Sequence, residues 1–195
     1  MAGSRKILFE THENFIKQSY RNRCRILTAN GVEDLVIPLR KPYQHVPITD
    51  IRIDNRQNWA GRHWKAIRSA YGKSPWFFQY KDAILEILES DKQFLAEFNL
   101  KTIDLCLKFL GMDINTGYTD KFDKQLPENF TDFRSRIHPK KKTDEWSYYR
   151  PVKYLQNFGP EFVPSLSVID LIFSEGPHAV NLLLNTLLTE NHKLN

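Results

Sequence analysis

Asn30-Gly31 lies between two runs in which apolar and polar residues alternate. Asn-Gly is the strongest short signal for a two-residue type I′ turn, because both central residues of that turn need a positive φ. The sequence therefore predicts an antiparallel β-hairpin at about residues 20–38. In the predicted register, Ala29 lies opposite Val32.

The two faces of this hairpin differ in character, because successive strand residues point to opposite sides of a sheet. The face that we expect to be buried carries Cys24, Ile26, Leu35 and Ile37. The opposite face, extended back along the chain, is expected to form a basic ladder of Lys17, Ser19, Arg21, Arg23 and Arg25. Arginine binds phosphate or carboxylate bidentately, so the ladder is a candidate anion site. The alternative is a solvated face that prevents edge-to-edge aggregation.

Composition places the chain among ordinary globular proteins and limits its partners. The 195 residues are enough for one domain with a substantial core. A net charge of +5 and a pI near 9.1 fit an anionic ligand, an acidic lipid surface or nucleic acid. The mean hydropathy of −0.50 and the lack of an apolar run of about 18 residues argue against a membrane span. The N-terminus has no apolar signal core, and Cys24 and Cys106 have no metal-ligand spacing, so we expect a reducing, cytoplasmic location.

Helical periodicity dominates the rest of the chain. Short strands are expected at residues 7–9, 48–54 and 114–122, and the overall prediction is a single α/β domain with a mixed sheet packed against several α-helices. No phosphate-cradling glycine loop, zinc-type spacing or Gly-x-Ser-x-Gly elbow is present, so no cofactor or metal is expected. The expected helices span residues 55–72, 81–89, 93–110 and 178–188, with one more starting at Pro164 and ending at Gly176.

The helix expected after Pro164 is apolar on all sides except at Ser167 and Asp170. These two residues are three apart and share a face. A buried carboxylate without partners is too costly to retain, so Asp170 should meet an arginine, a lysine or a set of hydrogen-bond donors. Two interpretations stay open, an ion pair that braces the basic hairpin and a catalytic base in a pocket shared with it.

Four stretches together resemble the WbqC-like family of bacterial proteins, in the branch found in Bacteroidetes-type bacteria. They are HENFIKQSYRNRCRIL, QNWAGRHWKAIRSAYGKSPWF, DFRSRIHPKK and FGPEFVPSLSVIDLIFSEGP, in the order that the family has them. We refer to them as the first to fourth motifs. The resemblance runs from about His12 to about Pro177. Two departures stand out: the family's usual N-terminal strand and Tyr-Phe-Pro-Pro loop are missing before His12, and Ser165 stands where asparagine is common.

The resemblance also suggests how the chain is organised. Residues 1–11 are expected to be a tag-like or truncated N-terminus, residues 12–189 a single WbqC-like domain, and residues 190–195 a flexible tail. The residues that the motifs carry over as substrate-binding candidates are Lys17, Tyr20, Arg21, Asn22, Arg23, Asn58, Trp59, Arg134, Lys140 and Ser167. Catalytic candidates are Asp170, which would orient a base or an amine, and His12 or His138, which would move a proton because histidine titrates near neutral pH.

Two functions follow as hypotheses. The family name comes from O-antigen gene clusters, which implies a transferase in surface polysaccharide biosynthesis, with acyl or aminoacyl transfer to an amino-sugar nucleotide as the reaction. Its partner would be an anionic small molecule, either a nucleotide sugar or an acyl donor. The alternative is a non-catalytic module that binds RNA or an acidic partner through the same basic face, with Tyr20, Trp59 and Trp64 as stacking platforms. The sequence leaves the oligomeric state open.

Overall fold

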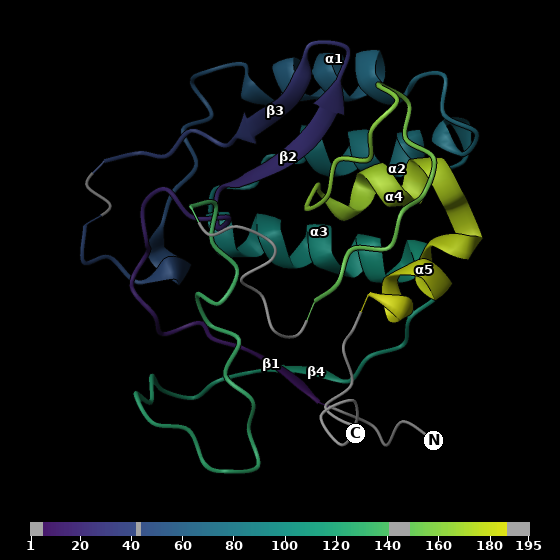
Figure 1. The fold of residues 1–195 in the computed structure, drawn as a ribbon. Coiled ribbons are helices and arrows are strands. Elements are labelled where there is room, and N and C mark those ends of the chain that lie inside the picture. Colours follow the sequence, from purple (N-terminus) through teal and green to yellow (C-terminus); the bar gives the residue numbers. More distant parts are fainter. Residues whose placement is uncertain (1–5, 42–43, 141–148, 187–195) are drawn as a thin grey trace, which may run out of the picture.

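A computed structural model describes residues 6–41, 44–140 and 149–186 (Figure 1). The chain forms a mixed α/β domain in which a β-hairpin packs against α-helices, as the sequence predicts. In chain order the elements are β1 (Ile7–Phe9), β2 (Arg23–Thr28), β3 (Gly31–Val36), the short 3-10 helix η1 (Ile48–Asp50), α1 (Trp59–Tyr71), α2 (Phe77–Glu89), α3 (Leu95–Phe109), β4 (Thr116–Tyr118), α4 (Val168–Glu175), the 3-10 turn η3 (Gly176–His178) and α5 (Ala179–Asn185).

Strands β2 and β3 form the predicted hairpin, but the predicted turn and register are wrong. Thr28 pairs with Gly31, so the turn residues are Ala29 and Asn30. Only Gly31 of the turn region has a positive φ, at 100°, which fits a turn closed by a glycine bulge and not a type I′ turn. The pairing is displaced by two residues from the predicted one, so the two faces of the hairpin keep their predicted composition.

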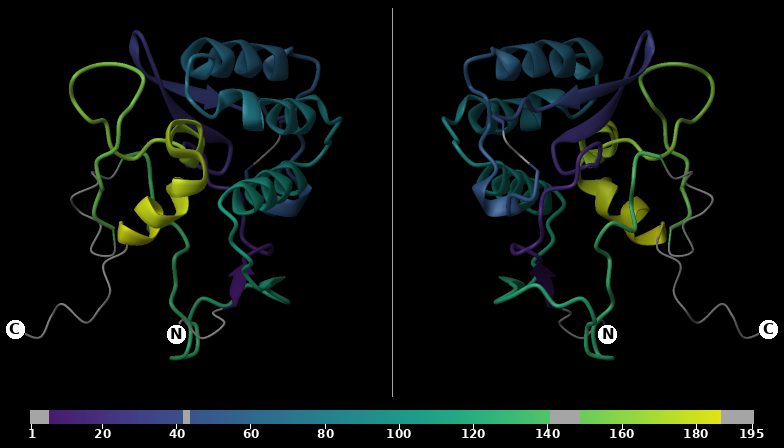
Figure 2. Two further views of the ribbon diagram at one scale, coloured as in Figure 1. Left: turned by 90° about the vertical axis from the view of Figure 1, so that its right-hand side faces the viewer. Right: turned by 90° about the vertical axis from the view of Figure 1, so that its left-hand side faces the viewer.

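The apolar face of the hairpin lies on the helices and is buried as expected. Ile26 is completely buried, and Leu35 and Ile37 join it in the core. Helix α1 lies behind the hairpin, and α2, α3 and α4 complete the core below it (Figure 1). Figure 2 shows α4 and α5 between helices α1–α3 and the 150–165 segment. This segment is therefore an outer layer on the C-terminal helices.

The basic ladder does not extend back to Lys17, because strand β2 begins at Arg23. Residues 17–22 form turns, Gln18 has a φ of 55°, and Ser19 is buried with its hydroxyl bonded to the Ile16 carbonyl. The strand expected at 48–54 is also absent: η1 occupies its start, and Arg52 and Ile53 make only isolated bridges to Phe94 and Leu39.

A second sheet, separate from the hairpin, ties the start of the described chain to its middle. Strand β1 pairs in parallel with β4, with Ile7 opposite Thr116 and Phe9 opposite Tyr118. These strands fall where the sequence predicts them. The helices also agree with the prediction apart from their ends: α1 starts at Trp59, α2 at Phe77 and α4 at Val168, and the predicted end of the last helix and the tail lie outside the described residues.

Helix α4 ends at a glycine that carries an unusual constraint. Gly176 has a φ of 54°, which L side chains rarely adopt, and it is buried. A Cβ built there would lie 2.2 Å from Cδ2 of the Trp76 indole. Trp76 is itself held to α4, because its N–H donates to the Phe173 carbonyl at 3.1 Å.

We expect Gly176→Ala to lower the free energy of unfolding by about 3 kcal/mol or more, because both the backbone and the Trp76 ring must move. Gly111→Ala is the matched control. Gly111 has a φ of 62°, but a Cβ added to it would meet no atom within 4 Å, so strain alone applies and the loss should be about 1–2 kcal/mol. Urea unfolding of both variants measures the difference, and equal losses would contradict the steric role of Trp76.

Candidate anion-binding site

The outer face of the hairpin carries two arginines that share one carboxylate. Arg23 Nη1 lies 3.5 Å from Asp34 Oδ2, and Arg25 Nε lies 3.3 Å from Asp34 Oδ1. Arg23 and Arg25 alternate with the buried residues of β2, so both point to the same side, as predicted. Nε of Arg23 is buried, and no acceptor for it exists among the described residues. We call Arg23, Arg25 and Asp34 the arginine face.

Neighbouring segments extend the arginine face. The Arg25 guanidinium lies 5.6 Å from the centre of the Tyr20 ring, and its Nη2 donates to the Pro139 carbonyl at 3.4 Å. Burial raises the pKa of Tyr20, so its hydroxyl stays protonated at neutral pH. Pro139 belongs to the third motif and is flanked by His138 and the exposed Lys140, whose N–H donates to His138 Nδ1 at 3.2 Å. The first and third motifs therefore meet here, 114 positions apart in the chain.

Arg134 attaches the third motif to the segment just before the first one. This side chain donates to both carboxylate oxygens of Asp132, at 3.0 and 2.9 Å, and to the Asp123 carbonyl at 2.8 Å. Its Nη1 lies 3.4 Å from Oε2 of Glu10, whose side chain is only 7% exposed. Hydrogen bonding to Asp132 raises the pKa of Arg134 further. Arg134 is thus fully engaged and holds the segment in place.

His12 lies at the edge of the same network. Thr119 donates to Glu10 Oε1 at 2.9 Å, and His12 Nδ1 lies 3.3 Å from the hydroxyl oxygens of both Thr11 and Thr119. The backbone N–H of His12 donates to Glu10 Oε1 at 2.7 Å. Because Nδ1 is engaged and the side chain is half exposed, Nε2 is the ring nitrogen available to a ligand.

Two of the candidate residues of the first motif support the backbone. Arg21 forms a bidentate ion pair with Glu13, at 2.7 and 2.6 Å, and both side chains are largely buried. A third Arg21 contact, from Nη2 to Ser135 Oγ at 3.3 Å, reaches the third motif. Asn22 is buried and donates to the Ile37 carbonyl. Lys17 lies in the exposed turn before them.

Backbone strain marks three of the segments that surround the arginine face. Gln18, Ser135 and Ser165 all have a φ between 55° and 63°, a region that non-glycine residues occupy rarely. Such residues cluster at functional sites, because the surrounding structure must hold them there. The positive φ of Ser165 fits the asparagine that the family resemblance leads us to expect at this position, because asparagine tolerates this conformation.

The fourth motif reaches the hairpin through Ser167. Its N–H donates to the Arg25 carbonyl at 2.8 Å, and it precedes the first residue of α4. Its hydroxyl also bonds the Cys24 thiol. Burial raises the pKa of Cys24 to about 11, and that of Cys106 to about 11 as well. Neither thiol is a ready nucleophile, and Cys24, predicted to be buried, is partly buried against the core.

Asp170 does not face the arginines, which corrects the expected convergence of the basic ladder and the acid on one pocket. Asp170 is 1% exposed. Its partners are a set of hydrogen-bond donors, which is one of the alternatives that the sequence predicts. The Tyr71 hydroxyl donates to Oδ1 at 2.8 Å, and the Tyr154 hydroxyl and Gln156 Nε2 lie 2.6 and 3.2 Å from Oδ2. Burial, followed by the charge of Asp170, raises the pKa of both tyrosines. We refer to these four side chains as the Asp170 node.

Sequence reasoning missed Tyr71, Tyr154 and Gln156. The helical spacing of Tyr71 with Trp64 and Ile67 places it on the inner side of α1, but nothing in this spacing points to an acid 99 positions away. Tyr154 and Gln156 lie in a segment without regular structure, where no periodicity signals an inward side chain. Their best signal is the isolated acid in an apolar helix, which requires neutral or cationic partners from somewhere in the chain.

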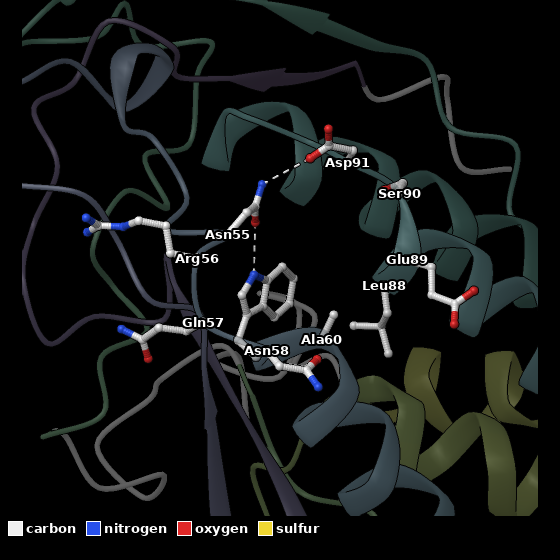
Figure 3. A pocket seen from close by; sticks show the side chains of 10 residues that line it. Asn55, Arg56, Gln57, Asn58, Ala60, Leu88, Glu89, Ser90 and Asp91 are labelled. Atoms are coloured by element: carbon white, nitrogen blue, oxygen red, sulfur yellow. Dashed lines mark hydrogen bonds between the residues drawn. The ribbon is translucent and has the colours of Figure 1, made fainter.

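The second motif lies at a separate pocket. A solvent-open cavity of about 340 Å³ is lined by Asn55, Arg56, Gln57, Asn58, Trp59, Ala60, Leu88, Glu89, Ser90 and Asp91 (Figure 3). Asn58 caps α1 by accepting from the Gly61 N–H at 3.1 Å. Trp59 is only 4% exposed, and Trp64 stacks on Phe77, so the expectation that these rings are stacking platforms for RNA is wrong.

Neither a membrane-spanning helix nor a metal-binding group is found in the described part of the chain. No helix within it has both the length and the apolar character that a bilayer span requires. No group of histidine, cysteine or acidic side chains within it is arranged to hold a metal ion.

Comparison with known proteins identifies the family of this chain. The sequence model of the WbqC-like protein family matches residues 1–137 and 138–182, so the chain belongs to the WbqC-like family. It is also 25% identical over 191 residues to a Mycobacterium tuberculosis protein described as uncharacterized protein Rv1507c, with 85% of this chain and 81% of that protein covered. No solved structure matches the chain.

Asp170→Asn should reduce the free energy of unfolding by about 1–3 kcal/mol, since the amide nitrogen cannot accept a hydrogen bond and leaves a buried donor unpaired. Asp104→Asn, the same change at an exposed site on α3, is the control and should alter stability by about 0.5 kcal/mol at most. Chemical denaturation measures both variants. Equal stability of the two would show that the Asp170 node does not support the fold.

The two cysteines should react slowly in the folded protein. With pKa values near 11 instead of the ordinary 9, about a hundredfold less thiolate is present at pH 8. Alkylation by iodoacetamide, followed by mass spectrometry, should therefore be at least about a hundredfold slower than in urea. Rapid modification of Cys24 at pH 8 would contradict its burial and make it a candidate nucleophile.

Proposed function

We propose that the protein is a cytoplasmic transferase of bacterial surface polysaccharide biosynthesis that binds a nucleotide-activated amino sugar at the arginine face and transfers an acyl or aminoacyl group to its amine. The link to polysaccharide biosynthesis rests on the origin of the family name. The choice of an anionic substrate rests on the structure, and on one observation in particular.

That observation is the imbalance of charge and hydrogen bonding on the arginine face. Two guanidinium groups share a single carboxylate at 3.3 and 3.5 Å, and Arg23 Nε has no acceptor among the described residues. A buried donor without an acceptor costs about 1–3 kcal/mol. An oxyanion bound to the two guanidinium groups would balance the positive charge that Asp34 leaves uncompensated. Arg23 and Arg25 are only partly exposed, at 22% and 32% of their side-chain surface, which is less than expected of cations that serve solubility alone.

The surroundings suit a diphosphate. Arginine forks bind phosphate oxygens bidentately, and the exposed Lys140 supplies a further point charge from the third motif. Tyr20, below the Arg25 guanidinium, adds an aromatic surface beside the anion. The hairpin backbone fixes the separation of Arg23 and Arg25. The protein itself therefore sets the positions of the groups that would bind the diphosphate.

His12 is the residue that we propose for proton transfer. In the reaction, a bond forms between the sugar amine and the acyl carbon of a thioester or ester donor, and the bond from that carbon to the leaving sulfur or oxygen breaks. His12 Nε2 takes the proton from the attacking amine and returns it to the leaving group. The hydroxyl groups of Thr11 and Thr119 fix the orientation of the ring through Nδ1. Asp170 acts instead through the fold, since its carboxylate contacts no histidine.

Binding of UDP-N-acetylglucosamine, measured by isothermal titration calorimetry, tests the anion site with opposite expectations for two variants. Arg25→Gln should weaken binding about tenfold or more, because a charged hydrogen-bond partner of the phosphate is lost. Asp34→Asn should strengthen binding about threefold to tenfold, because the competing carboxylate charge is removed. Arg68→Gln, the same change on the exposed surface of α1, should have no effect.

The outcomes separate the competing functions. Unchanged affinity in both Arg25→Gln and Asp34→Asn would refute the arginine face as the anion site. Preferential binding of single-stranded RNA, with strong salt dependence, would replace the transferase by the nucleic-acid alternative. Amide formation on an amino-sugar nucleotide, followed by mass spectrometry with acyl thioesters as donors and lost in His12→Ala, would establish the reaction and the role of His12.

A further inference from the structure

The pocket of the second motif is chemically different from the arginine face. Three carboxamides (Asn55, Gln57 and Asn58) lie on one side of it, and the end of α2 with Glu89, Ser90 and Asp91 lies on the other (Figure 3). The indole of Trp59 forms part of the wall between them, and Ala60 and Leu88 supply apolar surface. Its volume of about 340 Å³ falls within the range of small-molecule sites.

Several of these side chains are held in place by their neighbours. Asn55 accepts from Trp59 Nε1 at 3.0 Å and donates to Asp91 Oδ1 at 3.3 Å and to the Lys92 carbonyl at 3.0 Å, which joins the two walls of the pocket. Asn58 Oδ1 is fixed by the Gly61 N–H. The pocket is therefore preformed, and its shape does not depend on a ligand.

Other groups on the walls retain free hydrogen-bonding capacity. The Asn58 carboxamide uses its oxygen as a helix cap, and the Gln57 carboxamide uses its oxygen to accept from Arg62 Nη2, so both amide nitrogens keep their donors. On the opposite wall, Glu89 has no ion-pair or hydrogen-bond partner within the described chain, and Asp91 keeps its second oxygen. The lining of the pocket thus carries both free donors, on Gln57 and Asn58, and free acceptors, on Glu89 and Asp91.

The charge of the pocket argues against an anionic ligand. Arg56 is its single cationic side chain among the described residues, and Asp54 binds that guanidinium through two hydrogen bonds of 2.8 and 2.9 Å. The same hydrogen bonds lower the pKa of Asp54 to about 2, so this pairing persists at neutral pH. Two carboxylates remain on the wall, and a phosphate placed there would be repelled.

The geometry points to a site for an uncharged, hydroxyl-rich ligand of the size of a sugar ring. Each hydroxyl group both donates and accepts, so a ring of hydroxyls can accept from the amides of Gln57 and Asn58 while it donates to Glu89 and Asp91. Ala60 offers a partly exposed apolar surface for the ring's C–H groups, and only the edges of the buried Trp59 and Leu88 side chains reach the pocket beside it. This site stands independently of the proposed function, because it involves none of the residues of the arginine face.

Saturation-transfer NMR with glucose, galactose and N-acetylglucosamine, each at millimolar concentration, tests the site. At least one of these sugars should bind, and the double variant Gln57→Ala/Asn58→Ser should weaken its binding at least tenfold. Serine caps a helix as well as asparagine does, so this variant should keep its fold and its melting temperature. Ala60→Met, which fills the pocket with a side chain that favours helix, should have the same effect on binding.

Two controls separate this site from the arginine face and from general effects of substitution. Asn181→Ser makes the same change on the exposed surface of α5 and should leave sugar binding intact, as should Arg25→Gln. The absence of binding by all three sugars, or binding that survives both pocket variants, would overturn the proposal. Binding of inorganic phosphate or of ethylammonium in the pocket, with no sugar bound, would overturn it as well.

Discussion

The buried carboxylate of Asp170 is the contact on which the arrangement of the motifs depends. Its hydrogen bonds join α4 to α1 through Tyr71 and to the outer segment through Tyr154 and Gln156. Tyr71 continues the connection, because its hydroxyl oxygen accepts from the Leu27 N–H of the hairpin at 3.3 Å. Gln156 bonds both the N–H and the carbonyl of Val163 as well. Four segments, namely α4, α1, the outer segment and the hairpin, thus meet at one acid whose partners are neutral. In such a low-dielectric site the loss of any one donor lowers the stability of the whole network.

This node explains how a small hairpin can present a charged face with a defined geometry. The start of α4, fixed by Asp170, brings the Ser167 N–H to the Arg25 carbonyl. The third motif is held by the hydrogen bond from Arg21 to Ser135 and by the ion pair between Arg134 and Glu10. The arginines therefore rest on a backbone that is supported from both directions. Charged side chains that only kept the protein dispersed in water would need no such support, and this is the basis on which we propose the arginine face as a binding surface.

Sequence reasoning was reliable where a local rule decides the outcome. Strand alternation correctly predicts that Arg23 and Arg25 share a face and that Ile26 is buried. The free-energy cost of burying an unpaired carboxylate correctly predicts hydrogen-bond donors around Asp170. It failed where two local solutions compete or where the partner is remote. Asn30-Gly31 suits a type I′ turn, which needs a positive φ at both residues, but only Gly31 has one. The turn residues are Ala29 and Asn30, one position earlier than predicted. The basic ladder does not extend back from Arg23, because the chain turns at Gln18 and the Ser19 hydroxyl points inward. An alternating sequence pattern does not reveal such a turn.

The separation of the contacts along the chain also bears on the order of folding. The hairpin joins residues that are close in sequence, whereas Tyr71 and Asp170 are 99 positions apart and Arg25 and Pro139 are 114 apart. Loop-closure entropy delays such distant contacts, so the hairpin and the first helices can form early during synthesis on the ribosome. The arginine face is then completed only when the C-terminal segment has left the exit tunnel, and a nascent chain displays these cations before the contacts that support them have formed.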